Sequence, residues 1–318
     1  MRYGDQDRES QNVEDRRGQD SGPVAGRGMP FPLPMGAGRG LSIGTIVIIG
    51  VICLMLGINP LELLSGNGIP TMPDTSRTQP TQPTSQRSPF ELPRTPGPRQ
   101  AAPQNDEMSQ FVRRVLADTE DVWERVFAAS GQTYQKPTLV LFSRATQTAC
   151  GTGMSAMGPF YCPLDRKLYI DLKFYEDLKT KFGAPGDFAQ AYVIAHEVGH
   201  HVQTLLGVAE KVQSLKQRMD QARANAMQVR MELQADCLAG VWASLNDQLK
   251  KRLEAGDIQE GLNAASQIGD DTLQRRTQGQ VVPESFTHGS SEQRVRWFKR
   301  GLETSQMKAC DTFNAKDL

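Results

Sequence analysis

The sequence predicts an α+β fold, with a mostly helical domain and a small β-sheet over residues 106–318. Three observations lead to this prediction. Hydrophobic residues recur at helical spacing over most of that range, and two short runs have the composition or alternation of β-strands. Ahead of the domain, an uncharged apolar run predicts one transmembrane helix, and a Pro-rich tract predicts a disordered tether.

The overall composition limits the kind of partner. Lys plus Arg and Asp plus Glu each number 36 among the 318 residues, so the formal net charge is zero. Nucleic-acid-binding domains usually carry a basic excess, and we therefore expect no nucleic-acid partner. Five cysteines are present, and none forms a C-x-x-C pair, which argues against a structural zinc ribbon.

The first 40 residues are polar and rich in glycine, and neither a helical nor a strand period runs through them. Such a segment cannot bury enough apolar surface to order itself. We therefore expect residues 1–40 to form a disordered tail.

The run from Leu41 to Ile58 carries no charge. A helix of this length spans about 27 Å, which is close to the thickness of the bilayer core. A buried helix of a soluble protein is the alternative, but the run is apolar on every side. The positive-inside rule puts the tail in the cytoplasm and the domain outside it, because the first basic residue after the run is Arg77. The basic residues before the run include Arg16, Arg17, Arg27 and Arg39.

Residues 59–105 are dominated by Pro, Thr, Gln and Ser from about residue 66 onward. A tract with so few apolar residues cannot build a core, and it favours an extended chain. We therefore interpret residues 59–105 as a linker between the membrane segment and the domain at 106–318.

Four cysteines follow the linker, since Cys53 belongs to the apolar run. In an oxidising compartment they suit two disulfides, and we expect Cys150 to pair with Cys162 and Cys237 with Cys310. The first bridge would close a short glycine-rich loop, and the second would tie a helix to the C-terminal region. Four reduced, buried thiols are the alternative.

The domain contains one strand of clear alternation and several helices. Residues 167–175, KLYIDLKFY, alternate as a half-buried strand, and residues 138–142 are a shorter β-prone run. Periodicity and turn residues predict the helices. They cover residues 108–130, residues 188–253 with a break near Gly207, and two or three further segments that include residues 294–302.

One predicted helix carries the pattern His-Glu-x-x-His. His196 and His200 are four residues apart, so their imidazoles project from one face and can chelate one zinc ion. Glu197 points beside that metal, where it can take a proton from bound water. A solvated polar face is the alternative, but the chain has only four histidines. His201 points a third of a turn away, and we expect it to pack or to lie at the surface.

Catalytic zinc needs a third protein ligand and one open position. Glu232 and Asp236 lie one turn apart on a predicted helix that is otherwise apolar. Burying a carboxylate there costs free energy unless it binds a metal or another partner. If Glu232 is the ligand, Asp236 can accept a proton from the free ring nitrogen of His196 or His200. The reverse assignment, with Asp236 as ligand and Glu232 as support, stays open, and so does a surface position for both acids.

His288 lies outside this helix, in the stretch SFTHGSS ahead of a further predicted helix. A loop histidine can hydrogen-bond the oxyanion that forms during peptide hydrolysis. A surface or capping histidine is the alternative interpretation.

Five stretches of the chain resemble the bacterial neutral zinc metallopeptidases of the YpfJ type. They are RESQNVEDRRG at 8–18, GPFYCPLDRKLYID at 158–171, AHEVGHHVQ at 195–203, ELQADCLAGVWA at 232–243 and FTHGSSEQRVRWF at 286–298. The Glu-x-x-x-Asp pair is also similar to that of the gluzincin peptidases. The resemblance implies a zincin-like metallopeptidase domain in which Zn²⁺ is held by His196, His200 and Glu232, with Glu197 as the base.

Two functions follow as expectations. The first is an endopeptidase for peptide or protein substrates, anchored by a single pass in the bacterial inner (cell) membrane, with the 167–175 strand as a sheet edge for extended substrate. The second is a zinc-stabilised scaffold without catalysis. Glu197 argues against the second, because a purely structural zinc site has no use for a base.

Overall fold

A computed structural model describes residues 1–18 and 106–318, which belong to one compact unit. Helices dominate this unit and a small sheet accompanies them, so the predicted α+β class is confirmed. The transmembrane helix predicted for residues 41–58 and the linker predicted for residues 59–105 lie outside the described residues. Within the described ranges, no helix is both long enough and apolar enough to cross a membrane.

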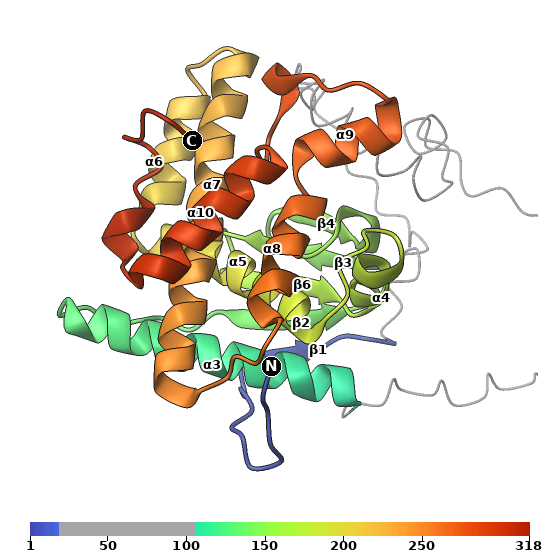
Figure 1. The fold of residues 1–318 in the computed structure, drawn as a ribbon, viewed down its shortest axis with the longest axis vertical. Coiled ribbons are helices and arrows are strands. Elements are labelled where there is room, and N and C mark those ends of the chain that lie inside the picture. The colour runs from blue at the N-terminus through green and yellow to red at the C-terminus, as the bar shows by residue number, and fades with distance from the viewer. Residues whose placement is uncertain (19–105) are drawn as a thin grey trace, which may run out of the picture. The chain divides into compact units, whose positions relative to one another are not determined.

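A four-stranded sheet forms one layer of the unit (Figure 1). The strands of the unit are β1 (Val13–Asp15), β2 (Thr138–Phe142), β3 (Ala145–Thr148), β4 (Gly151–Met154), β5 (Phe160–Cys162) and β6 (Lys167–Asp171). The sheet has the order β1-β2-β6-β5, in which the first three strands are parallel and β5 is antiparallel to β6. The strands β3 and β4 form a separate antiparallel hairpin.

The two faces of the sheet contact different cores, because side chains alternate along a strand. Leu139, Leu141 and Leu168 point into the main core, which the helices share. Val140 and Tyr169 point the other way, into a much smaller core on the outer face. The alternation predicted for the 167–175 run is therefore confirmed over the residues of β6.

The predicted strand is nevertheless too long, and its place in the sheet is not the expected one. β6 ends at Asp171, whose carboxylate accepts a hydrogen bond from the backbone N–H of Lys173 at 3.0 Å, where helix α4 (Lys173–Thr180) begins. This local hydrogen bond favours a helix start over continued alternation. β6 also lies between β2 and β5, so the expectation that it is a sheet edge is wrong, and the edges are β1 and β5.

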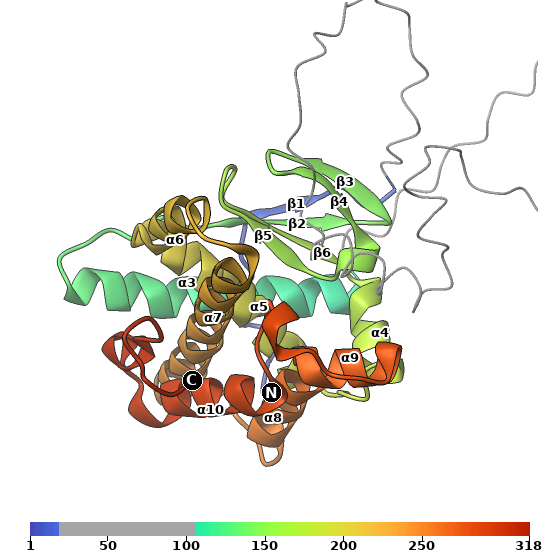
Figure 2. The ribbon, with the colours of Figure 1, turned by 90° about the horizontal axis from the view of Figure 1, so that it is seen from above.

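Helices cover one face of the sheet in successive layers (Figure 2). Besides α4, the helices are α3 (Glu107–Ala129), α5 (Asp187–Leu205), α6 (Val208–Lys216), α7 (Gln221–Lys250), α8 (Asp257–Gln267), α9 (Asp270–Gln278) and α10 (Ser291–Thr304). α3 and α5 lie against the sheet, and α8 and α10 lie beyond α5, with α7 contacting α5, α6 and α10. Short 3₁₀ turns are η1 (Ser155–Met157), η2 (Pro283–Ser285) and η3 (Met307–Cys310).

Residues 1–18 are ordered and pack on the domain, so the prediction of a disordered tail is wrong for them, while residues 19–40 lie outside the described part of the chain. Val13–Asp15 forms the strand β1, which pairs in parallel with β2. The same segment satisfies the carboxylate of Glu120, which is fully buried on α3. The donors are Arg8 at 2.8 Å, Ser10 at 2.5 Å and Asn12 at 2.8 Å. The segment thus shares one compartment with the domain.

A second buried carboxylate on α3 fixes the segment further. Asp118 is 1% exposed and accepts hydrogen bonds from Tyr3, Lys250 and Arg252. Arg252 also pairs with Asp7 at 2.7 Å, so a single guanidinium joins the N-terminal segment, α3 and the end of α7. The polar composition of residues 1–18 misled the prediction because these residues bind buried charges rather than bury apolar surface.

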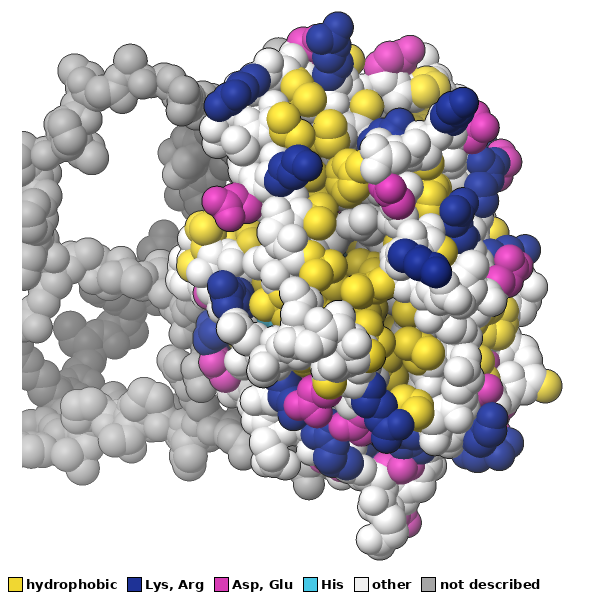
Figure 3. All heavy atoms as spheres, turned by 90° about the vertical axis from the view of Figure 1, so that its left-hand side faces the viewer, with side chains coloured by type: hydrophobic (Ala, Val, Ile, Leu, Met, Phe, Trp, Pro, Cys, Tyr) yellow, Lys and Arg dark blue, Asp and Glu magenta, His cyan; other side chains and the backbone are white. Residues whose placement is uncertain are grey.

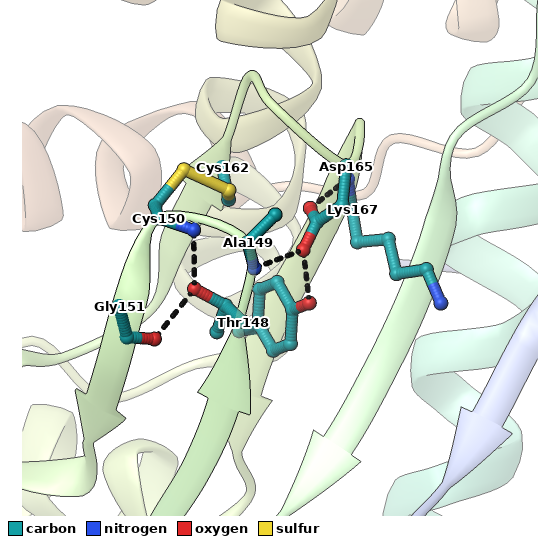
Figure 4. Close-up of a disulfide and its surroundings, with 8 residues drawn as sticks. Thr148, Ala149, Cys150, Gly151, Cys162, Asp165 and Lys167 are labelled. Carbon is teal, nitrogen blue, oxygen red and sulfur yellow. Dashed lines mark hydrogen bonds between the residues drawn. A yellow bond between two sulfur atoms is a disulfide. The ribbon is translucent and has the colours of Figure 1, made fainter. Parts of the chain in front are cut away.

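Both predicted disulfides are confirmed. Cys150 and Cys162 join the turn of the β3–β4 hairpin to the end of β5, with a Cα–Cα distance of 5.9 Å, and Asp165 binds the same turn (Figure 4). Cys237 and Cys310 join α7 to η3, with a Cα–Cα distance of 5.5 Å. The first bridge therefore fastens the hairpin to the sheet edge, and the second fastens the C-terminal segment to α7.

One face of the unit gathers many hydrophobic side chains. It is the left-hand side of Figure 1, where α6 and the C-terminal end of α3 lie, and Figure 3 shows its hydrophobic side chains in a band surrounded by Lys and Arg. The large exposed hydrophobic residues of the α5–α6 region are Leu206, 41% exposed, and Leu215, 37% exposed. The apolar surface of α6 is therefore only partly covered by the rest of the unit.

We predict that a chain lacking residues 1–18 will be strongly destabilised. Its buried Glu120 and Asp118 would lose charged partners, and an uncompensated buried charge costs about 3–5 kcal/mol. The melting temperature should fall by roughly 10 °C, measured by thermal unfolding beside the full chain. A synthetic peptide of residues 1–18, added in excess, should restore part of the loss. Equal melting temperatures for the two chains would contradict the prediction.

Candidate metal centre

Two helices bring the predicted metal ligands together. His196 and His200 lie one turn apart on α5, and their ring centroids are 4.8 Å apart. Glu232 reaches both from α7: its Oε2 lies 3.2 Å from Nε2 of His196 and 3.4 Å from Nε2 of His200. The two histidines and the glutamate therefore present three potential ligand atoms to one point, all within 4.8 Å of one another.

A glycine allows α5 and α7 to approach this closely. Gly199 lies between the two histidines, and a Cβ atom there would be 3.0 Å from the carbonyl oxygen of Ala235 and 3.1 Å from its Cα. Any side chain at this position would push the helix backbones apart. The glycine of His-Glu-Val-Gly-His thus sets the separation between the imidazoles on α5 and the carboxylate on α7.

The spacing of the ligand atoms fits a zinc ion. Zinc binds imidazole nitrogen and carboxylate oxygen at about 2.0–2.2 Å with tetrahedral angles, which separates two ligand atoms by about 3.4 Å. The observed separations from Glu232 Oε2 are 3.2 and 3.4 Å. These are longer than a charge-assisted hydrogen bond of about 2.8 Å. The donor set of two imidazoles and one carboxylate is also one that catalytic zinc uses.

The tautomer of His196 is fixed by its neighbours. Its Nδ1 lies 2.8 Å from Oδ1 of Asp236, which also accepts from the Tyr192 hydroxyl at 2.5 Å and from Arg294. An ionised carboxylate only accepts, so the proton of the neutral ring is on Nδ1 and the lone pair of Nε2 faces Glu232. Asp236 therefore lies where a supporting residue belongs, and Glu232 lies where a ligand belongs.

His200 is held in the same tautomer by an amide that the sequence analysis missed. Its Nδ1 lies 2.9 Å from Oε1 of Gln203, which is fully buried. The amide nitrogen of Gln203 donates to the carbonyl oxygen of Met231 at 2.8 Å and to Gln234 at 3.0 Å. The amide oxygen must therefore face His200. The signal for Gln203 was its place three residues after His200 on the same helix face.

The charges of the centre are balanced by partners. Burial raises the pKa of Asp236, but Arg294 and His196 outweigh burial and lower it to about 2. Burial also raises the pKa of Glu232, but His200, His196 and His288 lower it well below the usual range. Both acids are therefore anionic at neutral pH.

The third residue of the predicted motif has no partner of its own. Glu197 is only 8% exposed, and among residues 1–18 and 106–318 no hydrogen bond or ion pair reaches its carboxylate. Although the residue is largely buried, its carboxylate oxygens are not fully buried, so water or a bound molecule can reach them. The arrangement fits a carboxylate whose partner is a substrate or a water held at the adjacent metal position.

His288 lies in the loop between η2 and α10, and its side chain is 44% exposed. Its Nδ1 lies 3.3 Å from Asp270, whose other oxygen accepts from the backbone N–H groups of Thr287, His288 and Gly289. Burial lowers the pKa of His288, but Asp270 and the charge of Glu232 outweigh burial, so the pKa is raised. The sequence pattern gave no sign of Asp270.

His201 has the packing role that was predicted. It is fully buried, with Nε2 2.6 Å from the carbonyl oxygen of Gln135 and Nδ1 3.0 Å from the hydroxyl of Tyr161. Burial lowers its pKa to about 4, so it is neutral at pH 7. Because Tyr161 belongs to β5, this histidine fastens the edge strand of the sheet to α5.

These features define a His-His-Glu centre with the ligand set of a metallopeptidase zinc site. The family comparison agrees: the family model "Putative neutral zinc metallopeptidase" matches residues 1–313, and the chain belongs to this family. The family name also implies zinc as the metal.

Relatives of the chain occur in distant bacteria. The chain is 49% identical over 306 residues to the uncharacterized protein YpfJ of Escherichia coli (strain K12), covering 96% of each chain. It is 43% identical over 224 residues to the uncharacterized protein Rv2575 of Mycobacterium tuberculosis H37Rv, covering 66% of this chain and 73% of that protein. No solved structure matches the chain.

We predict that Glu232→Gln will weaken zinc binding far more than Asp236→Asn. Glu232 faces the Nε2 atoms of both histidines. Asp236 contacts the proposed ligands only through Nδ1 of His196, and loss of such a supporting contact costs about 10–100-fold in metal affinity. Competition against a chromophoric chelator measures the zinc affinities of both variants. The opposite order of affinities would move the ligand role to Asp236.

We also predict that zinc binding will release protons at neutral pH. Burial lowers the pKa of His200 in the metal-free protein, but Glu232 outweighs burial and raises it to about 9. Because zinc takes only the unprotonated imidazole, and the pKa of His196 is raised as well, apparent affinity should rise at least about tenfold per pH unit up to the pKa of His200 and then level off. Calorimetry in buffers of different ionisation enthalpy counts the protons. A flat affinity between pH 7 and 9 would contradict the prediction.

Proposed function

We propose that this chain is a zinc-dependent endopeptidase that hydrolyses peptide or protein substrates. One observation carries the proposal: Nε2 of His196, Nε2 of His200 and Oε2 of Glu232 converge, and no described residue pairs with the carboxylate of the neighbouring, largely buried Glu197. A structural zinc site has no use for such a carboxylate. Family membership supports the same chemistry in general.

In this proposal the chain's own residues move the protons. Zinc at this centre would supply a Lewis acid that activates water and polarises the scissile carbonyl. Glu197 accepts the proton of the attacking water on its carboxylate and passes it to the leaving amine. Because no described side chain binds this carboxylate, it is available to the attacking water.

His288 is proposed to stabilise the oxyanion that develops on the scissile carbonyl. It is the histidine outside α5, and the charge of Glu232 reaches it from the proposed ligand set. Asp270 accepts from Nδ1, which leaves Nε2 to donate to substrate. The backbone hydrogen bonds to Asp270 hold the loop, so the histidine is pre-positioned for this role.

An extended substrate is proposed to pair with β5. This strand is one of the two edges of the sheet, antiparallel to β6, and it contacts α5, which carries the two histidines. Edge strands offer unpaired backbone groups that can bind a peptide by strand addition. Tyr161 on β5 is bound to His201 of α5, so the edge and the proposed ligands are held together.

The compartment and the membrane attachment also remain proposals. We propose that the unit lies outside the cytoplasm, in an oxidising compartment, because disulfides join Cys150 to Cys162 and Cys237 to Cys310. We propose association with the bacterial inner membrane through the uncharged run from Leu41 to Ile58, with residues 1–18 and 106–318 on the same side of the membrane because β1 pairs with β2.

We predict that Glu197→Gln will keep zinc and fold but lose peptidase activity by about 10²–10⁴-fold, because the amide cannot accept the proton. The full chain, its zinc content measured, is incubated with a peptide library and the fragments are read by mass spectrometry. Glu210→Gln, an exposed acid on α6, serves as the control and should remain active.

Two outcomes would contradict this reading in different ways. If the zinc-loaded wild-type chain leaves every peptide intact, the endopeptidase proposal is wrong and a non-catalytic scaffold is favoured. If wild type cleaves and Glu197→Gln cleaves equally fast, the chain is a peptidase whose base is another residue.

A further inference from the structure

The two oxygens of Glu232 have different partners. Oε2 faces Nε2 of both His196 and His200, at 3.2 and 3.4 Å. Oε1 points away from the histidines and accepts a hydrogen bond from the side-chain amide of Gln228 at 2.7 Å. Gln228 lies one turn before Glu232 on α7, so the helix itself places the amide beside the outer oxygen.

The orientation of that amide is set from a different helix. Lys216, the last residue of α6, donates to Oε1 of Gln228 at 2.6 Å. An ammonium group has only donors, so the amide oxygen of Gln228 must face Lys216. Its NH₂ group must then face Glu232. The two hydrogen bonds form a relay in which Lys216 donates to Gln228 and Gln228 donates to Oε1 of Glu232.

We propose that Lys216 and Gln228 are positioning residues that keep Glu232 a one-oxygen ligand. The inference rests on the proposed function, in which Glu232 holds zinc with the two histidines. A carboxylate that binds a metal through both oxygens would occupy the position that catalytic zinc must keep open for water and substrate. The hydrogen bond from Gln228 engages Oε1 and leaves only Oε2 for the metal.

The relay completes a pattern in which each proposed ligand is oriented by a group that is itself oriented. Asp236 fixes His196 and is bound by Arg294. Gln203 fixes His200 and is bound to the carbonyl oxygen of Met231. The imidazoles receive acceptors, which fix their tautomers, whereas the carboxylate receives a donor, which fixes how many of its oxygens remain available.

Cobalt(II) provides the test, because tetrahedral Co²⁺ absorbs visible light much more strongly than five- or six-coordinate Co²⁺. The full chain is loaded with Co²⁺ and its visible spectrum is recorded for wild type, Gln228→Leu and Lys216→Met. Gln228→Leu removes the donor to Oε1 of Glu232, and Lys216→Met removes the group that orients this donor. In both variants we expect a clear loss of molar absorptivity of the bound Co²⁺. We also expect the zinc affinity to fall by about 10–100-fold.

Two matched variants separate positioning from mere structure. Lys216→Arg keeps donors at the same place and should retain the wild-type spectrum. Lys211→Met removes an exposed lysine of the same helix and should also leave the spectrum unchanged. If Gln228→Leu fails to fold, Lys216→Met alone decides, because it leaves every residue of α7 intact.

The outcomes distinguish this inference from the proposed function. Stoichiometric metal binding in wild type, with unchanged spectra and affinities in Gln228→Leu and Lys216→Met, would overturn the inference and leave the zinc site standing. If the His196→Ala variant still binds the metal as the wild type does, the proposed ligand set is wrong, and the inference fails with it. A change in Lys211→Met equal to that in Lys216→Met would overturn the role of the relay.

Discussion

The close crossing of α5 and α7 at Gly199 is the constraint on which the rest of the centre depends. A Cβ atom there would lie 3.0 Å from the carbonyl oxygen of Ala235, so a side chain at this position would require the helices to shift apart. The imidazoles and Glu232 are far apart in sequence, and only this approach brings them to zinc-binding distance. A similar contact of Gly240 and Gly301 brings α10 against α7, which delivers Arg294 to Asp236.

Local pattern predicted the elements that carry the ligands, and tertiary contacts decided what it could not. The spacing of His196 and His200 and the acids of α7 were readable because helical periodicity is local. Gln228 and Asp270 were not, since their roles depend on which atoms another element brings near, whereas Gln203 could have been found from its spacing to His200 on the same helix. The strand β1 was missed because three residues cannot form a stable strand alone, and only the hydrogen bonds to β2 stabilise them as one.

Buried acids show how the unit distributes charge. Glu120 and Asp118 on α3 are satisfied by residues 1–18 and by the end of α7, and Asp236 by Arg294, Tyr192 and His196. Glu232 shares its oxygens between two imidazoles and an amide. In the described part of the chain Glu197 stands out as the buried acid left without a partner, at the place where chemistry would need one.

The pairing of β1 with β2 also restricts the path of the chain through lipid. Val13 lies opposite Leu139 in one sheet, so the segments before and after residues 19–105 lie on the same side of any bilayer. A chain that begins and ends on one side crosses an even number of times or not at all. A lone traverse by Leu41–Ile58, which hydropathy and the arginine distribution favour, would separate the two strands by the thickness of the membrane and is incompatible with their hydrogen bonds.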